Sequence, residues 1–134
     1  MIVVDTNIIC YRCMASPYAG DADAAWQRDP QWIAPLLWRS EFRNALAGPL
    51  RKGLLTIDAA IEITNLAESL LAGREFAVSS SAILRLVDLS GCSAYDCEFV
   101  ALAEHQNVPL ITVDRQILRE FPKRAIPLKK FLRR

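Results

Sequence analysis

Short apolar runs alternate with amphipathic stretches along this chain. The runs have the length and composition of buried parallel strands, and they cover residues 2–4, 32–34, 76–78 and 109–113. Between them, apolar residues recur at helical spacing. Helices are therefore expected at about residues 7–14, 21–27, 36–46, 57–72, 81–90 and 93–106, and in a short stretch after residue 114.

The order of these elements predicts the class of fold. A further run at residues 126–128 contains Pro127, which predicts an edge strand because proline cannot donate to a central ladder. Strands that alternate with helices favour an α/β fold, a three-layer α/β/α sandwich around a parallel sheet of four to five strands. Its crossover connections should be right-handed.

Several residues indicate where the expected helices begin and end. Thr6 or Asn7 can cap the first helix. Gly48 and Pro49 together interrupt the third, and Gly73 ends the fourth. Asp114 can cap the short helix that follows the fourth strand.

Length and composition describe an ordinary folded chain. The 134 residues fit a single domain over residues 1–134, and 52% hydrophobic with 23% charged residues exclude a disordered chain. No apolar run reaches the roughly 18 residues of a membrane-spanning helix. The opening MIVVDTN is too short and too soon acidic for a secretory signal. We therefore expect a cytoplasmic protein with no membrane association.

The four cysteines and the basic end of the chain each allow two interpretations. Cys10 and Cys13 have C-x-x-C spacing, which suits a zinc half-site or a redox pair, whereas Cys92 and Cys97 are poorly spaced for zinc. Buried free thiols are the simpler interpretation. The net charge is only +1, but a basic cluster follows residue 120, and it could attract phosphates or merely be solvated. The cluster comprises Lys123, Arg124, Lys129, Lys130, Arg133 and Arg134.

Four acidic residues stand at positions that bring them together. Asp5 and Asp114 each follow an apolar strand, and the carboxyl ends of parallel strands share one edge of a sheet. Glu41 lies on an otherwise apolar helix, and Asp96 opens another helix, where the helix dipole favours an anion. Alone, each acid could be a helix cap or a solvated side chain. The four together indicate a site.

Carboxylates brought together repel one another, and a bound cation relieves that repulsion. Hard cations such as Mg²⁺ or Mn²⁺ prefer oxygen ligands. Such ions activate water for in-line attack on a phosphodiester and stabilise the leaving oxygen.

The same residues resemble a known family. The opening MIVVDTN resembles the first motif of PIN domains, particularly VapC-type toxins of toxin–antitoxin pairs. Glu41 in WRSEFRNAL is similar to that family's helix-borne glutamate. Asp96 in SAYDCEFVALA is the closest match to the third motif, and Asp114 in PLITVD is similar to the fourth. The resemblance spans Met1 to about Leu128, although helix pattern alone carries residues 50–90.

This resemblance implies a Mg²⁺- or Mn²⁺-dependent endoribonuclease, inhibited by a cognate antitoxin and forming a homodimer. By position, Asp5, Glu41, Asp96 and Asp114 would be the metal-binding and catalytic acids. Polar neighbours would orient them or contact the RNA substrate; these are Thr6, Asn7 and Thr112. Basic side chains could hold the RNA backbone; the candidates are Arg12, Arg39, Arg43, Lys129 and Lys130.

Other functions fit the sequence less well. A haloacid-dehalogenase-like enzyme would need D-x-D, but Asn7 stands two places after Asp5, and no phosphate-binding P-loop is present. Serine–histidine catalysis would depend on His105 alone, late in a helix. Glu98 should face about 200° away from Asp96 and lie outside the acid set. The alternative from another class is a non-catalytic PIN-like module that binds RNA or a protein.

Overall fold

A five-stranded parallel sheet forms the centre of the molecule in a computed structural model, which describes residues 1–134. The strand order is β3-β2-β1-β4-β5, and every neighbouring pair is parallel. The sheet predicted from the sequence is thereby confirmed, including the edge position of the last strand. The strands are β1 (Ile2–Val4), β2 (Trp32–Pro35), β3 (Glu75–Phe76), β4 (Leu110–Thr112) and β5 (Ala125–Pro127).

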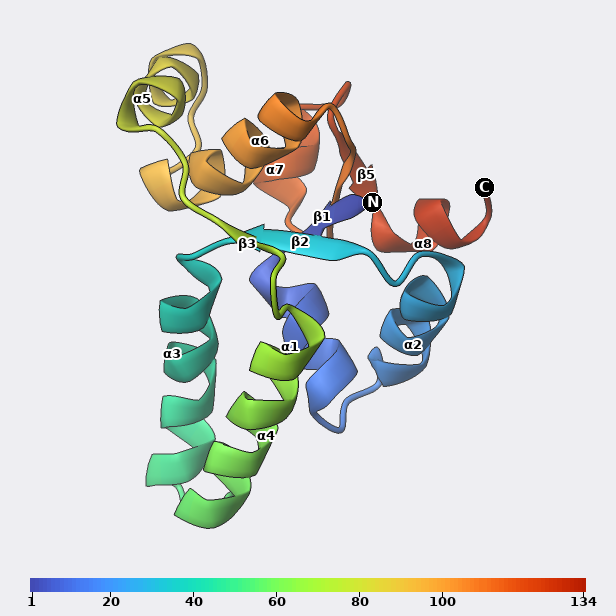
Figure 1. Ribbon diagram of the computed structural model, residues 1–134, viewed down its shortest axis with the longest axis vertical. Helices are drawn as coiled ribbons and strands as arrows, with labels where there is room; N and C mark the ends of the chain where they lie inside the picture. The colour runs from blue at the N-terminus through green and yellow to red at the C-terminus, as the bar shows by residue number, and fades with distance from the viewer.

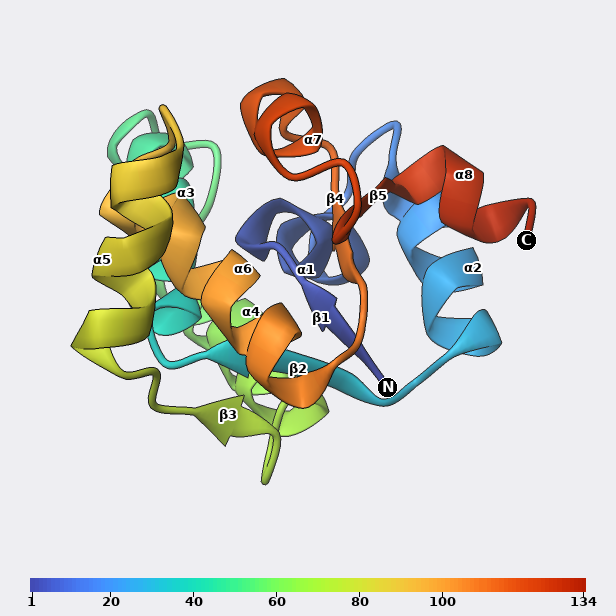
Figure 2. The ribbon, with the colours of Figure 1, turned by 90° about the horizontal axis from the view of Figure 1, so that it is seen from above.

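Helices cover both faces of the sheet, which gives the expected three layers (Figures 1 and 2). One face carries α1 (Thr6–Cys13), α2 (Ala19–Arg28), α3 (Trp38–Arg51) and α4 (Ile57–Leu70). The other carries α5 (Ser80–Leu89), α6 (Ala94–Gln106) and α7 (Arg115–Glu120). A last helix, α8 (Leu128–Leu132), packs against α2 beside β5. None of these helices is long and apolar enough to cross a lipid bilayer.

The direction of chain progression reverses between β1 and β4. From β1 the chain moves outward through β2 to β3, then returns to add β4 and β5 on the other side of β1. In open α/β sheets this reversal leaves a crevice beyond the carboxyl ends of the two central strands. Asp5 directly follows β1, and Asp114 follows β4 by two residues.

The core is apolar and closely tied to the central strands. A cluster of 30 buried residues includes Trp32, Trp38, Phe42 and Phe99. The only buried polar residues are Thr6, just after β1, and Thr112, at the end of β4. The four cysteines are free thiols, and all but Cys13 are buried. Burial raises the pKa of Cys10 to about 12, so this thiol stays protonated.

Two local sequence predictions were wrong. Asp5, rather than Thr6 or Asn7, caps α1, because the strand leads straight into the helix and the Asp5 carboxylate accepts from the Thr6 N–H. Helix α3 also continues through Gly48 and Pro49. Proline removes only its own N–H there; the carbonyls of both residues still accept hydrogen bonds, from Lys52 and Leu54.

The chain end also differs from its prediction. The edge strand ends at Pro127, and Leu128 begins α8 rather than completing the strand. Leu128 and Phe131 are buried at helical spacing, while Lys129 and Lys130 between them are exposed. Part of the basic cluster is therefore carried on an amphipathic helix that closes the core. The remaining boundaries differ from prediction by only a few residues.

Candidate functional site

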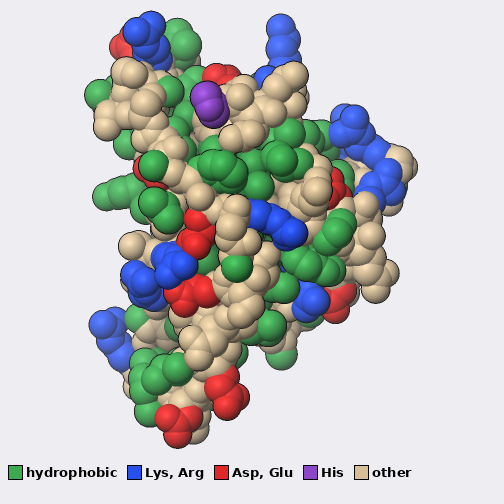
Figure 3. Space-filling model, in the orientation of Figure 1, with side chains coloured by type: hydrophobic (Ala, Val, Ile, Leu, Met, Phe, Trp, Pro, Cys, Tyr) green, Lys and Arg blue, Asp and Glu red, His purple; other side chains and the backbone are tan.

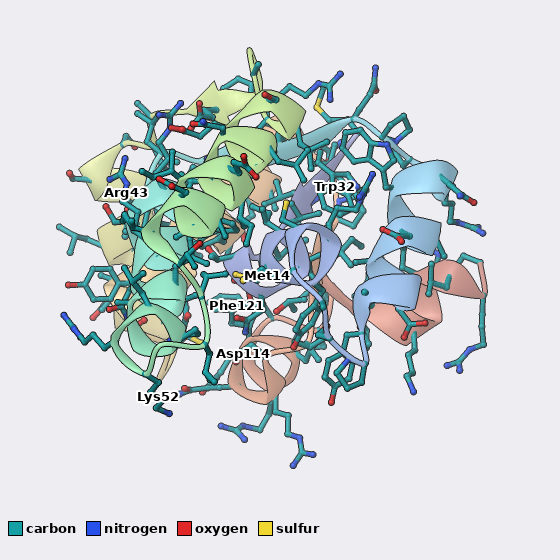
Figure 4. All side chains as sticks on the ribbon, turned by 90° about the horizontal axis from the view of Figure 1, so that it is seen from below. Met14, Trp32, Arg43, Lys52, Asp114 and Phe121 are labelled. Carbon is teal, nitrogen blue, oxygen red and sulfur yellow. The ribbon has the colours of Figure 1, made fainter.

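A cavity of about 500 Å³ opens beyond the carboxyl ends of β1 and β4. All four acids singled out in the sequence line it: Asp5, Glu41, Asp96 and Asp114. They come from four separate segments, namely the end of β1, α3, the first turn of α6 and the residue before α7. Asp114 is labelled beside α7 in Figure 4. We call this feature the acidic cavity.

Asp5 accepts a hydrogen bond on each of its two carboxylate oxygens. Its Oδ1 accepts from the Thr6 N–H at 2.7 Å, and its Oδ2 accepts from the Thr112 hydroxyl at 2.7 Å. Burial nevertheless raises the pKa of Asp5, and the nearby charges of Asp96 and Asp114 raise it further. The two hydrogen bonds oppose this shift without cancelling it.

Glu41 reaches the cavity from the opposite face of the sheet to α6. Trp38 and Phe42 are fully buried on the neighbouring side of α3 and fix how that helix is turned. The Glu41 Oε1 accepts from the Thr6 hydroxyl at 2.7 Å. Burial raises the pKa of Glu41, and the charges of Asp5 and Asp96 add to the increase.

Asp96 and Asp114 both stand at helix starts. The Asp96 N–H donates to the hydroxyl of Ser93 at 3.1 Å, so Asp96 is held in the first turn of α6. Burial, and then the charge of Asp114, raise the pKa of Asp96. Asp114 caps α7, where its Oδ1 accepts from the Ile117 N–H at 2.9 Å.

An acid can be both a helix cap and part of the site. Asp5 and Asp114 are helix caps, yet both line the cavity together with the other two acids. The amino ends of α1, α6 and α7 therefore all lie at this site, where their dipoles favour negative charge. No lysine, arginine or histidine lines the cavity, so its negative charge has no internal partner.

The donor set suits a hydrated divalent cation better than a closed cage. No three acidic, histidine or cysteine side chains are arranged to hold an ion directly. Mg²⁺ keeps several of its waters and commonly takes only one or two carboxylates from the protein. Burial, and then repulsion between the acids, raises the pKa values of Asp5, Glu41 and Asp96, and a bound cation would offset both by stabilising the charged carboxylates. The residues therefore fit an ion of this kind.

The predicted polar neighbours occupy different positions. Thr6 and Asn7 line the cavity, and Asn7 is exposed within it. Thr112 is fully buried behind the cavity, where its hydroxyl donates to Asp5 and accepts from the Asp114 N–H at 3.0 Å. This one hydroxyl therefore links two of the four acids. Glu98 does not line the cavity.

None of the basic residues suggested for RNA binding lines the cavity. Arg12 pairs with Asp23 at 3.4 Å and lies over the ring of Trp26. Arg43 projects from the outer side of the α3–α4 pair, away from Asp114 (Figure 4). Lys129 and Lys130 are on α8, at the opposite side of the molecule from α3 (Figures 1 and 2).

Arg39 is engaged in a separate structure, which we call the arginine clasp. Its guanidinium makes a two-point contact with Glu75, at 2.6 and 2.7 Å, and also binds Glu68. The indole N–H of Trp38 donates to the same Glu75 at 2.8 Å. These contacts join α3, α4 and β3, and Figure 3 shows acidic and basic side chains side by side on this face. The contact with Arg39 lowers the pKa of Glu75.

Sequence reasoning missed five residues that line the cavity. Three of them are on α3 and a fourth is its N-cap residue, and helical spacing contained part of the signal, since positions 37, 41, 44 and 45 share one face of a helix. The fifth is adjacent to Asp96 but is exposed rather than buried. The five are Leu37, Ser40, Asn44, Ala45 and Tyr95.

Comparison with known proteins gives a family and two similar folds. A family model described as "PIN domain" matches residues 2–123. A search of curated proteins found no match. PAE2754 from Pyrobaculum aerophilum has a similar structure, with a TM-score of 0.76 and 22% sequence identity over 98% of this chain and 92% of that one. FitAcB from Neisseria gonorrhoeae is also similar, with a TM-score of 0.69 and 16% identity over 96% and 99%.

Proposed function

The chain belongs to the PIN domain family, and from this premise we propose that it is a Mg²⁺- or Mn²⁺-dependent endoribonuclease. One observation carries the proposal: four carboxylates from four separate segments line a single cavity at the point where the strand order reverses. A cavity with that charge and no basic lining residue is poorly suited to bind RNA directly. A divalent cation between the carboxylates and the RNA phosphate resolves the mismatch.

Asp5, Glu41, Asp96 and Asp114 would hold the ion between them, one or two of them directly and the others through its bound waters. When bound, it would activate water and stabilise the charge that develops on the phosphate and the leaving oxygen. The chain's own contribution is orientation. Thr112 and the Thr6 N–H fix both oxygens of Asp5, and the Thr6 hydroxyl fixes Glu41. Restraints of this kind keep ligand oxygens aimed at a cation.

RNA phosphates outside the cavity need basic partners, and Arg115 is the best placed. It directly follows Asp114, is exposed, and forms no ion pair. Arg43 is also free of ion pairs, but it projects away from Asp114 and could contact only RNA that extends beyond the cavity. Arg39 is less suitable because Glu68 and Glu75 occupy its guanidinium.

We further propose that this nuclease is the toxin of a cytoplasmic toxin–antitoxin pair and forms a homodimer, as its resemblance to VapC-type toxins implies. The unpaired acids of the cavity support an inhibitor that inserts an arginine or lysine among them. If a small protein is encoded next to this chain, co-expression of the two should yield a stable complex without RNA cleavage. A protein that purifies alone and stays inactive with RNA would contradict this role.

The enzymatic proposal is tested by RNA cleavage with and without Mg²⁺ or Mn²⁺, in the wild type and in Asp5→Asn. We expect cleavage only with the cation and only in the wild type, with 5′-phosphate and 3′-hydroxyl ends. Ends with 2′,3′-cyclic phosphate would exclude this route. RNA binding that needs no cation, with no cleavage in any condition, would instead favour a non-catalytic binding module.

A further inference from the structure

Tyr95 is an aromatic side chain with no structural task in the fold. It is 64% exposed and lines the acidic cavity beside Asp96. Its ring has no aromatic partner and takes no part in the hydrophobic core. Tyr11 and Tyr18, by contrast, stack on each other with ring centroids 4.8 Å apart. Folding therefore leaves one tyrosine ring free, and it lies at the cavity.

The lining of the cavity limits how RNA can be held there. Four acids line it and no basic side chain does, so none of its side chains can pair with a phosphate through opposite charge. Among the remaining groups, several can contact a nucleobase. Tyr95 offers an aromatic face from α6. The Asn44 amide comes from α3 and Leu37 from its N-cap, in the layer on the other face of the sheet.

We infer that Tyr95 is the base-stacking residue of this site, and that the RNA nucleotide next to the cleaved bond is unpaired and lies on its ring. The inference rests on the proposed ribonuclease function and adds a substrate-binding residue to it. Aromatic side chains bind splayed, single-stranded bases by stacking, since every base has a π-face. Tyr95 precedes Asp96, so a stacked base would bring its own phosphate close to the acids.

The first test separates the ring from the hydroxyl in steady-state cleavage of a single-stranded oligoribonucleotide. Stacking of a base on an aromatic side chain strengthens binding by about 5- to 150-fold. We expect Tyr95→Leu to raise KM within that range with little change in kcat, and Tyr95→Phe to keep most of the affinity. Tyr18→Leu is the matched control, because Tyr18 is 48% exposed but lies outside the cavity.

An abasic ribose placed on either side of the cleaved bond identifies the stacked nucleotide. At one of the two positions the abasic substrate should raise the wild-type KM as much as Tyr95→Leu does. The variant should then show no further loss on that substrate, because both changes remove the same contact. Additive losses, an unchanged KM in Tyr95→Leu, or equal losses in Tyr95→Phe and Tyr95→Leu would each overturn the inference.

A binding measurement keeps the inference separate from cleavage. In an oligoribonucleotide carrying 2-aminopurine at successive positions, stacking on Tyr95 should quench the fluorescence at one position in the wild type. The quenching should disappear in Tyr95→Leu. If the wild type cuts RNA but shows no such difference, the stacking role fails and the nuclease stands. If RNA is bound and quenched but never cut, the proposed function fails while the stacking contact survives.

Discussion

Helix α3 carries two charged residues, two positions apart, that belong to opposite electrostatic environments. Arg39 enters the arginine clasp, where it neutralises Glu75 and lowers the pKa of that carboxyl. Glu41 enters the acidic cavity, where burial and its acidic neighbours raise its pKa. The glutamate anion is thus stabilised at Glu75, in the clasp, and destabilised at Glu41, in the cavity.

The difference separates a structural cluster from a candidate active site. In the clasp every charge has a partner within the chain, so nothing remains to bind. In the cavity the carboxylates accept from hydroxyl and N–H donors, but no lysine, arginine or histidine side chain lies among them. Hydrogen bonds alone do not reverse the pKa shift of Asp5, which leaves the cavity suited to an external positive charge.

The largest expected effect comes from removing one charge of the cavity. Asp5→Asn should lower the rate of RNA cleavage by at least about 100-fold, because changes to groups that merely support metal ligands already cost about 10- to 100-fold. Glu75→Gln is the matched carboxylate-to-amide change in the clasp and should keep most of the activity. Cleavage rates at saturating Mn²⁺ compare the two. Equal losses would show that the cavity has no special role.

The next effect comes from the hydroxyl that links two cavity acids. Thr112→Val should reduce the cleavage rate by about 10-fold or more, because Asp5 loses one donor and the Asp114 N–H loses its acceptor. Thr112→Ser keeps the hydroxyl and should recover most of the rate. If valine and serine behave alike, the hydroxyl does not orient the acids.

In the clasp the expected effect is on stability rather than on activity. Glu75→Ala leaves the buried indole N–H of Trp38 without an acceptor and should lower the free energy of unfolding by about 1–3 kcal/mol. Denaturant unfolding measures this loss. A free energy of unfolding that does not change would show that the clasp contributes nothing to the fold.

The two sites should also respond oppositely to pH. The folded protein lowers the pKa of Glu75 below its usual 4.5, so its stabilising contribution is present above that pH and is lost as the pH falls through the lower value. The pKa of Asp5 is raised above 3.8, so folding binds its proton more tightly. Its contribution is therefore greatest in acid and declines as the pH rises through the raised value. The free energy of unfolding that the wild type has in excess of Glu75→Gln should rise with pH, whereas its excess over Asp5→Asn should fall with pH. Denaturant unfolding at a series of pH values measures both differences.

The smallest expected effect is cation-dependent stabilisation. At a free Mn²⁺ concentration ten times its Kd, the free energy of unfolding should rise by about 1.4 kcal/mol. The increase should be larger near neutral pH than in mild acid, because protons compete for Asp5, Glu41 and Asp96. Glu75→Gln should keep this response and Asp5→Asn should lose it. Thermal unfolding of the three proteins with and without Mn²⁺ provides the comparison.

The sequence alone predicted the layers of the fold and the four acids that line the cavity. Apolar runs that end in Asp5 and shortly before Asp114 follow from the requirement that a parallel sheet be buried on both faces. The reversal of strand order then brings Asp5 and Asp114 together. Glu41 and Asp96 were predicted instead from their places on helices and from the resemblance to PIN domains. The layers and the two strand-end acids depend on periodicity and on strand direction, which a sequence displays.

Tertiary structure decided which charges are partnered. Nothing in the sequence distinguishes Arg39, held by Glu68 and Glu75, from Arg43, which forms no ion pair. The partners of Arg39 are 29 and 36 residues away, on α4 and β3. Likewise, the exposure of the Tyr95 ring became known only from the folded structure, in which no core residue packs against it. Pairing and exposure depend on distances between remote segments, and only the folded chain fixes those distances.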